Sequence, residues 1–403
     1  MPSLESVVRA GDLVAVADGC GAPLGMGPAL TRTAHARPGT RLLLGWCPAP
    51  VDGLCFEAFT DVRTVMGGYG LRTAIDSGRV RYVPARLGAV PALLAGPLRP
   101  DVLVVAARRD GRRYFLGSEV GWARAAIEVG ARVALVLNDA LPVSDADGPL
   151  SVGDAAVVAE QSRPPVARSS VGASPVFGRI GAHVASLIPE GARLQHGPGP
   201  LGDAIATALE VPVRVDSGLV TDAVVDLDSR GLLVGEATAA YLSGTERLYR
   251  WADGRPVLHR VEHTHDLGRL AAGPHPLVAV NAALEIDLTG QVNVERSAGS
   301  IVGGVGGHSD YAAAAARCPG GSSIVALPSS HDGHSTLVER IEGPITTPRH
   351  DVDVVVTERG WVDLRGLDDV ERGAALLDHW GGDLRRPGAA RQDDRPGRAA
   401  GGE

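Results

Sequence analysis

Short apolar runs, rich in leucine and β-branched residues, recur along the whole chain and constrain its fold more than any other feature. Each run is bounded by Gly, Pro or Asp, as is typical of strands that are buried on both faces of a parallel sheet. Alanine-rich stretches at 119–130 and 310–318 lie between such runs and are expected to be helical. Alternating strands and helices predict an α/β fold with mostly parallel sheets. The clearest strand candidates are 12–18, 41–46, 101–107, 131–138, 276–281, 322–328 and 351–357.

A loose internal repeat divides the chain into two halves. Residues 11–30 and 191–209 each contain a strand candidate, a Gly/Pro-rich turn and a helix candidate. A repeat with so long a period predicts two related α/β domains, which we place at residues 1–180 and 185–385. The polar, proline-bearing stretch near 160–190 is the expected linker between them.

The end of the chain has a different composition from the rest. Residues 386–403 are rich in Arg, Gly and Pro and show no apolar period. Such a segment has too little apolar surface to offset the entropy of ordering, so we expect residues 386–403 to form a disordered tail.

Composition excludes several classes of function. The 403 residues are 44% hydrophobic and carry a formal net charge of −8, which argues against a nucleic-acid binder with a basic face. The chain contains no lysine, which excludes a lysine Schiff base and a P-loop lysine. The first residues lack a signal-peptide pattern, and the apolar runs are too short to span a membrane. We expect a cytoplasmic protein that binds neither nucleic acid nor membrane.

Metal binding is not expected either. The four cysteines form no CxxC pair, and the histidines form no HExxH motif. The cysteines are therefore interpreted as reduced thiols, and the site is expected to contain no metal.

Residues 280–316 hold the densest set of chemical groups. The run VNAALEIDLTGQVNVE (280–295) places Glu285 and Asp287 in alternation with apolar residues, and SAGSIVGGVGGHSDYAAAAA (297–316) is a glycine-rich loop that leads into a helix. The backbone N–H groups of such a loop can hold a phosphate or an oxyanion. A tight packing turn explains the glycines about as well, so the loop alone leaves the function open.

Taken in order, four segments of the chain resemble the acetyl-CoA hydrolase/transferase family of class I CoA-transferases. The resemblance is strongest from about residue 190 to 380 and weaker in the first half. It implies two Rossmann-like domains with the active site between them, coenzyme A as part of an acyl-CoA substrate, and a carboxylic acid as partner substrate. The oligomeric state stays open, with a homodimer among the options. The segments are 281–292, 304–311, 320–328 and 346–366.

The resemblance also shows where this chain departs from the family. A family glutamate attacks the thioester, and its segment I-H-S-E-M-x-S-D-G-V-V-D-L aligns without a gap on VDSGLVTDAVVDL (215–227). Ser217 falls on the family serine, Asp216 on its histidine and Gly218 on the glutamate. The register is supported by the matching residues that follow. The position of the nucleophile is therefore expected to be vacant at Gly218.

A second departure concerns the groups that stabilise the oxyanion. The turn LQHGPGP (194–200) resembles a family turn whose middle residue supplies an N–H group, but that residue is Pro198, which has none. The expected oxyanion or CoA-binding positions are therefore Gly199, Gly306, Gly307 and His308. Without the carboxylate and one donor, the ordinary ping-pong transfer is not expected.

Several side chains are candidates to replace the glutamate. Asp216 lies two residues before the vacancy, so strand alternation predicts the same face and a role in activating water, with local capping as the alternative. For Glu285 we favour a framework role, because it matches a family position that exists beside the nucleophile. His196, His308, His331 and His334 lie in loops near the expected cleft and could act as acid or base, although each alone is better explained as structural.

These observations favour hydrolysis of a CoA thioester over CoA transfer, because hydrolysis needs no glutamyl-CoA intermediate. Two alternatives stay open: an enzyme that uses the same cleft for a small molecule other than a CoA ester, and a catalytically silent paralogue that acts by binding. The sequence does not identify the acyl group or the acceptor.

Overall fold

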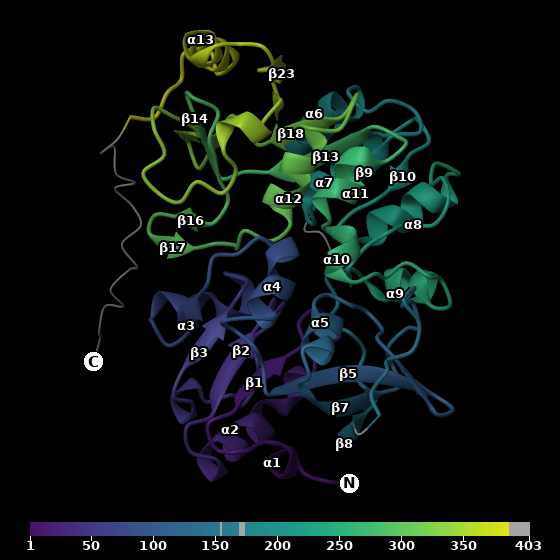
Figure 1. The fold of residues 1–403 in the computed structure, drawn as a ribbon. Coiled ribbons are helices and arrows are strands. Elements are labelled where there is room, and N and C mark those ends of the chain that lie inside the picture. Colours follow the sequence, from purple (N-terminus) through teal and green to yellow (C-terminus); the bar gives the residue numbers. More distant parts are fainter. Residues whose placement is uncertain (154, 169–173, 387–403) are drawn as a thin grey trace, which may run out of the picture.

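A computed structural model describes residues 1–153, 155–168 and 174–386 of the chain. The first half folds around a sheet in the order β4-β3-β2-β1-β5-β7-β8, in which every neighbouring pair is parallel, and β6 adds to β5 in antiparallel fashion. This sheet lies in the lower half of Figure 1. Its strands are β1 (Leu13–Val16), β2 (Arg41–Leu44), β3 (Val62–Thr64), β4 (Arg81–Tyr82), β5 (Val102–Asp110), β6 (Arg113–Phe115), β7 (Arg132–Asn138) and β8 (Ala156–Gln161).

The second half folds around a sheet in the order β10-β9-β13-β18-β22-β23, in which only the last pair is antiparallel. The predicted α/β fold with mostly parallel sheets is therefore confirmed, and every strand candidate corresponds to a strand of one of the two sheets. The strands are β9 (Arg193–His196), β10 (Arg214–Val215), β13 (Leu277–Ala282), β18 (Ser322–Ala326), β22 (Val354–Thr357) and β23 (Gly360–Asp363).

Smaller strands pair outside these sheets. They are β11 (Leu219–Val220) with β12 (Tyr241–Leu242); β14 (Glu285–Asp287) with β15 (Val292–Asn293) and β21 (Leu337–Val338); β16 (Arg296–Ser297) with β17 (Ser300–Ile301); and β19 (Ser330–His331) with β20 (His334–Ser335). The helices are α1 (Leu4–Val7), α2 (Gly27–Ala36), α3 (Arg72–Asp76), α4 (Val90–Leu94), α5 (Ala123–Glu128), α6 (Pro175–Ala185), α7 (Pro200–Ala208), α8 (Asp222–Ser229), α9 (Glu246–Ala252), α10 (Val261–Thr264), α11 (Leu267–Ala272), α12 (His308–Ala315) and α13 (Asp369–His379).

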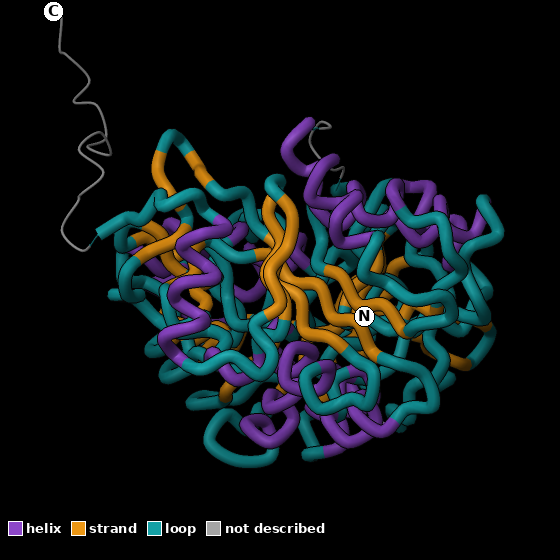
Figure 2. Tube along the Cα trace, turned by 90° about the horizontal axis from the view of Figure 1, so that it is seen from above, coloured by secondary structure: helices purple, strands orange, loops and turns teal. Residues whose placement is uncertain are grey.

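Successive side chains along each strand point to opposite faces of the sheet, and helices cover both faces. In β13, Val278 and Val280 pack in one apolar cluster with residues of α6 and α7, whereas Leu277 and Ala279 pack in another with residues of α11 and α12. In β1, alternate residues likewise pack toward α2 and toward α4 and α5. Seen from above, strands run side by side through the molecule with helices on both sides (Figure 2). This covering on both faces explains why the strand sequences are continuously apolar.

The stretch predicted as a linker differs from expectation. Strand β8 ends at Gln161, and helix α6 occupies Pro175–Ala185 and packs against α7. The proline begins a helix there, and the Ser174 hydroxyl caps it by accepting a hydrogen bond from Val176 N at 3.3 Å. The domain bounds 1–180 and 185–385 stay a prediction. The predicted disordered tail, apart from Arg386, lies outside the described residues.

Contacts from the first half hold the glycine-rich loop of the second half in place. The Tyr82 hydroxyl accepts a hydrogen bond from Val305 N at 3.1 Å and donates one to Glu295 at 3.0 Å. Leu87 N donates to Gly306 O at 2.8 Å. At Gly68, a Cβ atom would lie only 2.3 Å from Val302 O, so the two chain segments meet backbone to backbone.

This close approach predicts the effect of adding a methyl group. Gly68→Ala should destabilise the fold by about 1–3 kcal/mol more than Gly78→Ala, as measured by urea denaturation. Both glycines have positive φ, 81° and 75°, but a Cβ atom at Gly78 would meet no atom within 4 Å. The control therefore carries the backbone strain without the collision, and equal losses for both variants would contradict the contact.

Candidate functional site

A cavity of about 280 Å³ lies where strands of both sheets end. Parallel α/β sheets commonly bind ligands at the carboxyl ends of their strands. Here the first sheet and the second sheet both contribute such positions to the same cavity wall. They include Asp18 after β1, Trp46 after β2, Val65 after β3, His196 at the end of β9, Gly218 after β10 and Ala282 at the end of β13.

Gly218, the expected vacant position, lies in the cavity wall, and the imidazole of His265 occupies the space beside it. A Cβ atom on Gly218 would lie 2.8 Å from His265 Nε2 and 3.4 Å from the ring of Tyr311. A Cβ atom on Gly307 would lie 2.4 Å from the same Nε2 atom. The two glycines thus leave the room that the histidine ring fills, so the side chain of a glutamate does not fit at position 218 beside it.

His265 is held as a neutral ring. Its Nδ1 atom lies 2.8 Å from the Thr264 hydroxyl, and its Nε2 atom is buried without a hydrogen-bond partner among the described residues. Burial lowers the pKa of His265 to about 3, and the nearby Arg269 guanidinium adds to this effect. Since Thr264 Oγ1 can donate or accept, Nε2 is the ring nitrogen left to exchange a hydrogen bond with a ligand.

The glycine-rich loop brings Gly306, Gly307 and His308 to the cavity, as the sequence predicted. Gly307 precedes the first residue of α12, so its N–H group belongs to the helix N-terminus and has no partner within the helix. The Nε2 atom of His308 is buried without a partner among the described residues, and burial lowers the pKa of His308 to about 4. The loop therefore offers backbone donors next to uncharged imidazoles.

The turn after β9 differs from the glycine-rich loop in the groups that it brings to the cavity. His196 and Pro198 line the cavity, whereas Gly199 precedes α7 with a φ of 110° and is not part of the cavity lining. His196 Nδ1 lies 3.1 Å from Gly197 O, and burial lowers the pKa of His196. The turn thus places an imidazole and a proline, but no N–H group at residue 198, at the cavity wall.

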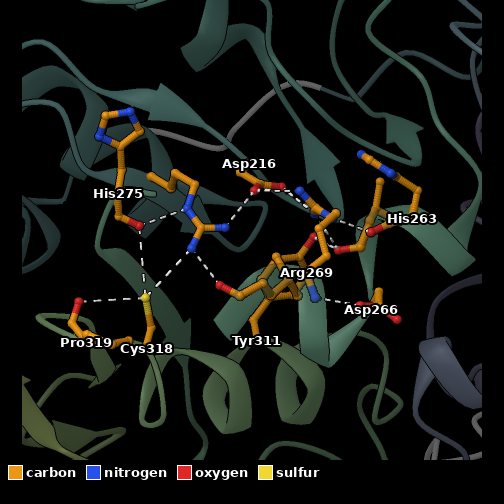
Figure 3. A network of polar contacts seen from close by, with 11 residues as sticks. Asp216, His263, Asp266, Arg269, His275, Tyr311, Cys318 and Pro319 are labelled. Atoms are coloured by element: carbon orange, nitrogen blue, oxygen red, sulfur yellow. Dashed lines mark hydrogen bonds and ion pairs between the residues drawn. The ribbon is translucent and has the colours of Figure 1, made fainter. Parts of the chain in front are cut away.

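Asp216 is not part of the cavity lining but is held by two arginines (Figure 3). Arg269 binds both of its carboxylate oxygens, at 2.9 and 2.8 Å, and Arg193 approaches at 3.3 Å. Asp216 is 5% exposed. The carboxylate proposed as a water activator is therefore engaged by two guanidinium groups and joins β10, β9 and α11.

The remaining sequence candidates lie away from the cavity. Glu285 accepts hydrogen bonds from Asn293, at 2.8 Å, and from Arg385, which fits the framework role. His331 and His334 are exposed on the β19–β20 hairpin. The structure thus brings His196, Gly218, Gly306, Gly307 and His308 together and leaves these three residues outside.

Sequence reasoning missed His265 because no motif marks it and it lies far along the chain from Gly218. One signal was present: His259, His263 and His265 are three of only twelve histidines and occur within seven positions. It also missed the aromatic residues Trp46 and Tyr241, which line the cavity.

Asp18 was missed as well, and it is the one carboxylate in the described cavity lining. It accepts hydrogen bonds from Trp46 N at 2.9 Å and from the Tyr241 hydroxyl at 3.1 Å. Burial raises the pKa of Asp18 to about 6. Glu119 lies behind it, outside the lining, accepts a hydrogen bond from Gly21 N at 3.0 Å, and has a pKa raised to about 8 by burial. Near neutral pH, Asp18 is thus largely ionised and Glu119 largely protonated.

The part of the chain that the structure describes shows neither a metal cluster nor a membrane-spanning helix. Within residues 1–153, 155–168 and 174–386, no group of three or more His, Cys, Asp or Glu side chains is placed to hold a metal ion. Over the same ranges, no helix combines the length and the apolar character needed to cross a membrane.

The cavity and the two mostly parallel sheets define an α/β protein with a ligand-sized site, and comparisons with known proteins show what it is similar to. Residues 244–385 match the family model described as "Acetyl-CoA hydrolase/transferase C-terminal domain". The succinyl-CoA:acetate/propanoyl-CoA:succinate CoA transferase of Fasciola hepatica is 29% identical over 77% of this chain and 69% of its own length. The 4-hydroxybutyrate coenzyme A transferase of Clostridium kluyveri is 28% identical, with 76% of each chain covered.

Among solved structures, RipA from Yersinia pestis superposes with a TM-score of 0.84 at 24% identity, covering 94% of this chain and 93% of RipA. The predicted resemblance is confirmed: residues 244–385 match the acetyl-CoA hydrolase/transferase C-terminal domain, and the chain is similar to CoA transferases over 77% and 76% of its length. The replacement of the family glutamate by Gly218 stays a prediction.

The Asp216 network predicts a large loss of stability. Asp216→Ala should lower the free energy of unfolding by about 3–5 kcal/mol in urea denaturation, because it leaves the buried Arg193 guanidinium without its carboxylate. Asp226→Ala is the matched control, because it breaks an ion pair in which the side chains of Asp226 and Arg247 are 50% and 47% exposed. This variant should lower the free energy of unfolding by at most about 1 kcal/mol. Similar losses for both variants would contradict the buried ion pair.

Proposed function

We propose that the protein cleaves the thioester of an acyl-CoA in this cavity, with water in the place of the family's glutamate. The observation that carries the proposal is the position of His265, whose ring fills the space that a glutamate at position 218 needs. A covalent glutamyl-CoA intermediate has no residue to form on there. The acyl-CoA substrate class is supported by the relatives, which are CoA transferases.

In the proposed reaction the thioester carbonyl faces the glycine-rich loop. The N–H groups at Gly306 and Gly307 stabilise the oxyanion, which is the largest single contribution in many acyl transfers. Water adds to the carbonyl carbon, the C–S bond breaks, and the proton that water loses ends on the departing CoA thiol. The products are a carboxylic acid and free coenzyme A.

His265 Nε2 is the group that we assign to hold the water. Its pKa of about 3 keeps the ring neutral, so that in the tautomer protonated at Nδ1 the Nε2 lone pair is free at neutral pH. The same burial makes it a weak base, so its contribution is to orient the water rather than to remove a proton completely. A thioester is a reactive acyl donor, and orientation together with the oxyanion contacts supports its hydrolysis.

Thiol release measured with and without an acceptor acid tests this function. Incubation with acetyl-CoA and longer acyl-CoAs should release free coenzyme A at a rate that does not depend on added acetate or succinate. Intact-protein mass spectrometry should find no CoA adduct. Acceptor-dependent exchange or an adduct would overturn direct hydrolysis, and absence of CoA binding in calorimetry would favour the alternative of a small-molecule ligand other than a CoA ester.

Substitution at position 218 tests the geometry that carries the proposal. Gly218→Glu alone should destabilise the protein by about 1–3 kcal/mol, because the new side chain collides with the His265 ring. Combining it with His265→Ala should recover the stability and permit some acceptor-dependent CoA transfer. The matched control is Gly218→Gln with His265→Ala, which should recover folding but not transfer, since an amide is not a nucleophile. A single Gly218→Glu variant as stable as the parent would show that the ring does not fill this space.

A further inference from the structure

The end of the cavity next to Gly218 is an aromatic box closed by a carboxylate. Trp46 lies at right angles to two tyrosines, with its ring centroid 5.8 Å from Tyr69 at an interplanar angle of 72° and 6.0 Å from Tyr241 at 82°. The Tyr241 hydroxyl donates to Asp18 at 3.1 Å. All four side chains line the cavity, and we call them the aromatic box.

This box adjoins the reaction centre. The backbone N–H of Tyr241 donates to Gly218 O at 3.2 Å, so the residue that contacts Asp18 also fixes the position expected to lack its nucleophile. His265 and Tyr311 form the neighbouring part of the wall, with ring centroids 5.2 Å apart. An acyl chain whose carbonyl lies at the glycine-rich loop can therefore extend toward Asp18.

Asp18 has no cationic partner among the described residues, and of the three buried aspartates without one (Asp18, Asp287 and Asp310) it is the one that lines the cavity. Four buried aspartates are each within ion-pair distance of arginine: Asp12 with Arg132, Asp145 with Arg124, Asp216 with Arg193 and Arg269, and Asp351 with Arg317. Among the described residues no arginine forms an ion pair with Asp18, and none lines the cavity, in a chain whose 39 basic residues are all arginine. An unpaired buried carboxylate is costly, and a cation in the cavity would remove that cost.

Aromatic rings supply the second part of the same recognition. A cation within about 6 Å of a ring centroid is attracted by the electrons of the ring face, and aromatic cages bind quaternary ammonium groups in this way. Tyr69 already shows the effect, because the Arg168 guanidinium lies 5.2 Å from its ring centroid. Arg168 is not part of the cavity lining, so Trp46, Tyr241 and Asp18 are the groups available to a ligand.

We infer that the substrate is an acyl-CoA whose acyl chain ends in an ammonium group, bound in the aromatic box by Asp18, Trp46 and Tyr241. This assignment rests on the proposed function for the position of the thioester. It adds the class of the acyl group, which the relationship to CoA transferases leaves open.

A matched pair of ligands tests the assignment. One acyl-CoA ends in a trimethylammonium group, and the other carries a tert-butyl group of the same shape and no charge. At a pH above 7, where Asp18 is ionised, calorimetry should show the cationic ligand binding roughly tenfold or more tightly. Thiol release should show the same preference in kcat/KM.

Variants locate the preference in the box. Asp18→Asn should reduce the ratio of the two affinities several-fold, with the remainder due to the aromatic rings. Glu119→Gln is the matched control, because it changes the neighbouring buried carboxyl that does not line the cavity, and it should leave the ratio unchanged. If Asp18→Asn does not fold, Trp46→Leu should lower the ratio instead. A ratio near one in the parent protein, or a ratio that survives both Asp18→Asn and Trp46→Leu, would overturn the assignment.

A measurement without coenzyme A separates this inference from the proposed function. Tetramethylammonium alone should bind to the parent protein, detected by calorimetry, and more weakly to Asp18→Asn. If this cation binds but no acyl-CoA does, the proposed function is wrong and cation binding by the aromatic box is supported. If both acyl-CoAs are cleaved equally and tetramethylammonium does not bind, recognition of an ammonium group by the aromatic box is wrong and the proposed function is supported.

Discussion

The burial of His265 among three glycines, two of them beside its ring, is the constraint on which the arrangement of the site depends. Gly88 comes from the first half of the chain, Gly218 follows β10, and Gly307 precedes α12, and a Cβ atom on any of them would lie 3.1 Å or less from an atom of His265. Interiors are packed so closely that such a side chain determines what its neighbours can be. Gly218 and Gly307 are therefore best explained as the small residues that the histidine requires. The predicted vacancy is a space already filled by another group.

Several buried carboxylates of the core are paired with arginine, whereas the cavity has a carboxylate and imidazoles but no arginine in its lining. Burying a carboxylate requires a partner, and Asp216 shows the usual solution, with two guanidinium groups on one carboxylate. At the cavity, the imidazoles of His265 and His308 are kept neutral by burial, and Asp18 has hydrogen-bond donors but no cation. A wall of uncharged donors and acceptors with one carboxylate differs from a site built for anionic acceptor acids, for which an arginine would supply the natural partner.

Much of the fold could be predicted because its signals are local. The strands β1, β5, β7, β13 and β18 are continuous apolar runs, and their burial on both faces is what makes them so. Part of the stretch near 160–190 that was expected to be a linker forms α6 (Pro175–Ala185), because a proline marks a helix start as well as a linker. In the site, the resemblance to the CoA-transferases pointed to Gly306, Gly307 and His308, which line the cavity. It could not locate His265, because the contact with Gly218 joins residues 47 positions apart and depends on packing that no periodicity records.

The expectation for Asp216 shows why a strand pattern alone does not assign a catalytic role. Two residues before Gly218, it was expected on the same face, but a β10 of only two residues ends at Val215. Beyond Val215, strand alternation no longer determines which way a side chain points, and the Asp216 carboxylate contacts Arg193 and Arg269. A carboxylate that two arginines hold outside the cavity lining is not placed to contact a substrate in the cavity. By the same reasoning, the groups at the cavity without a charged partner, His265 and Asp18, are the ones to which the proposed reaction assigns the thioester and the end of the acyl chain.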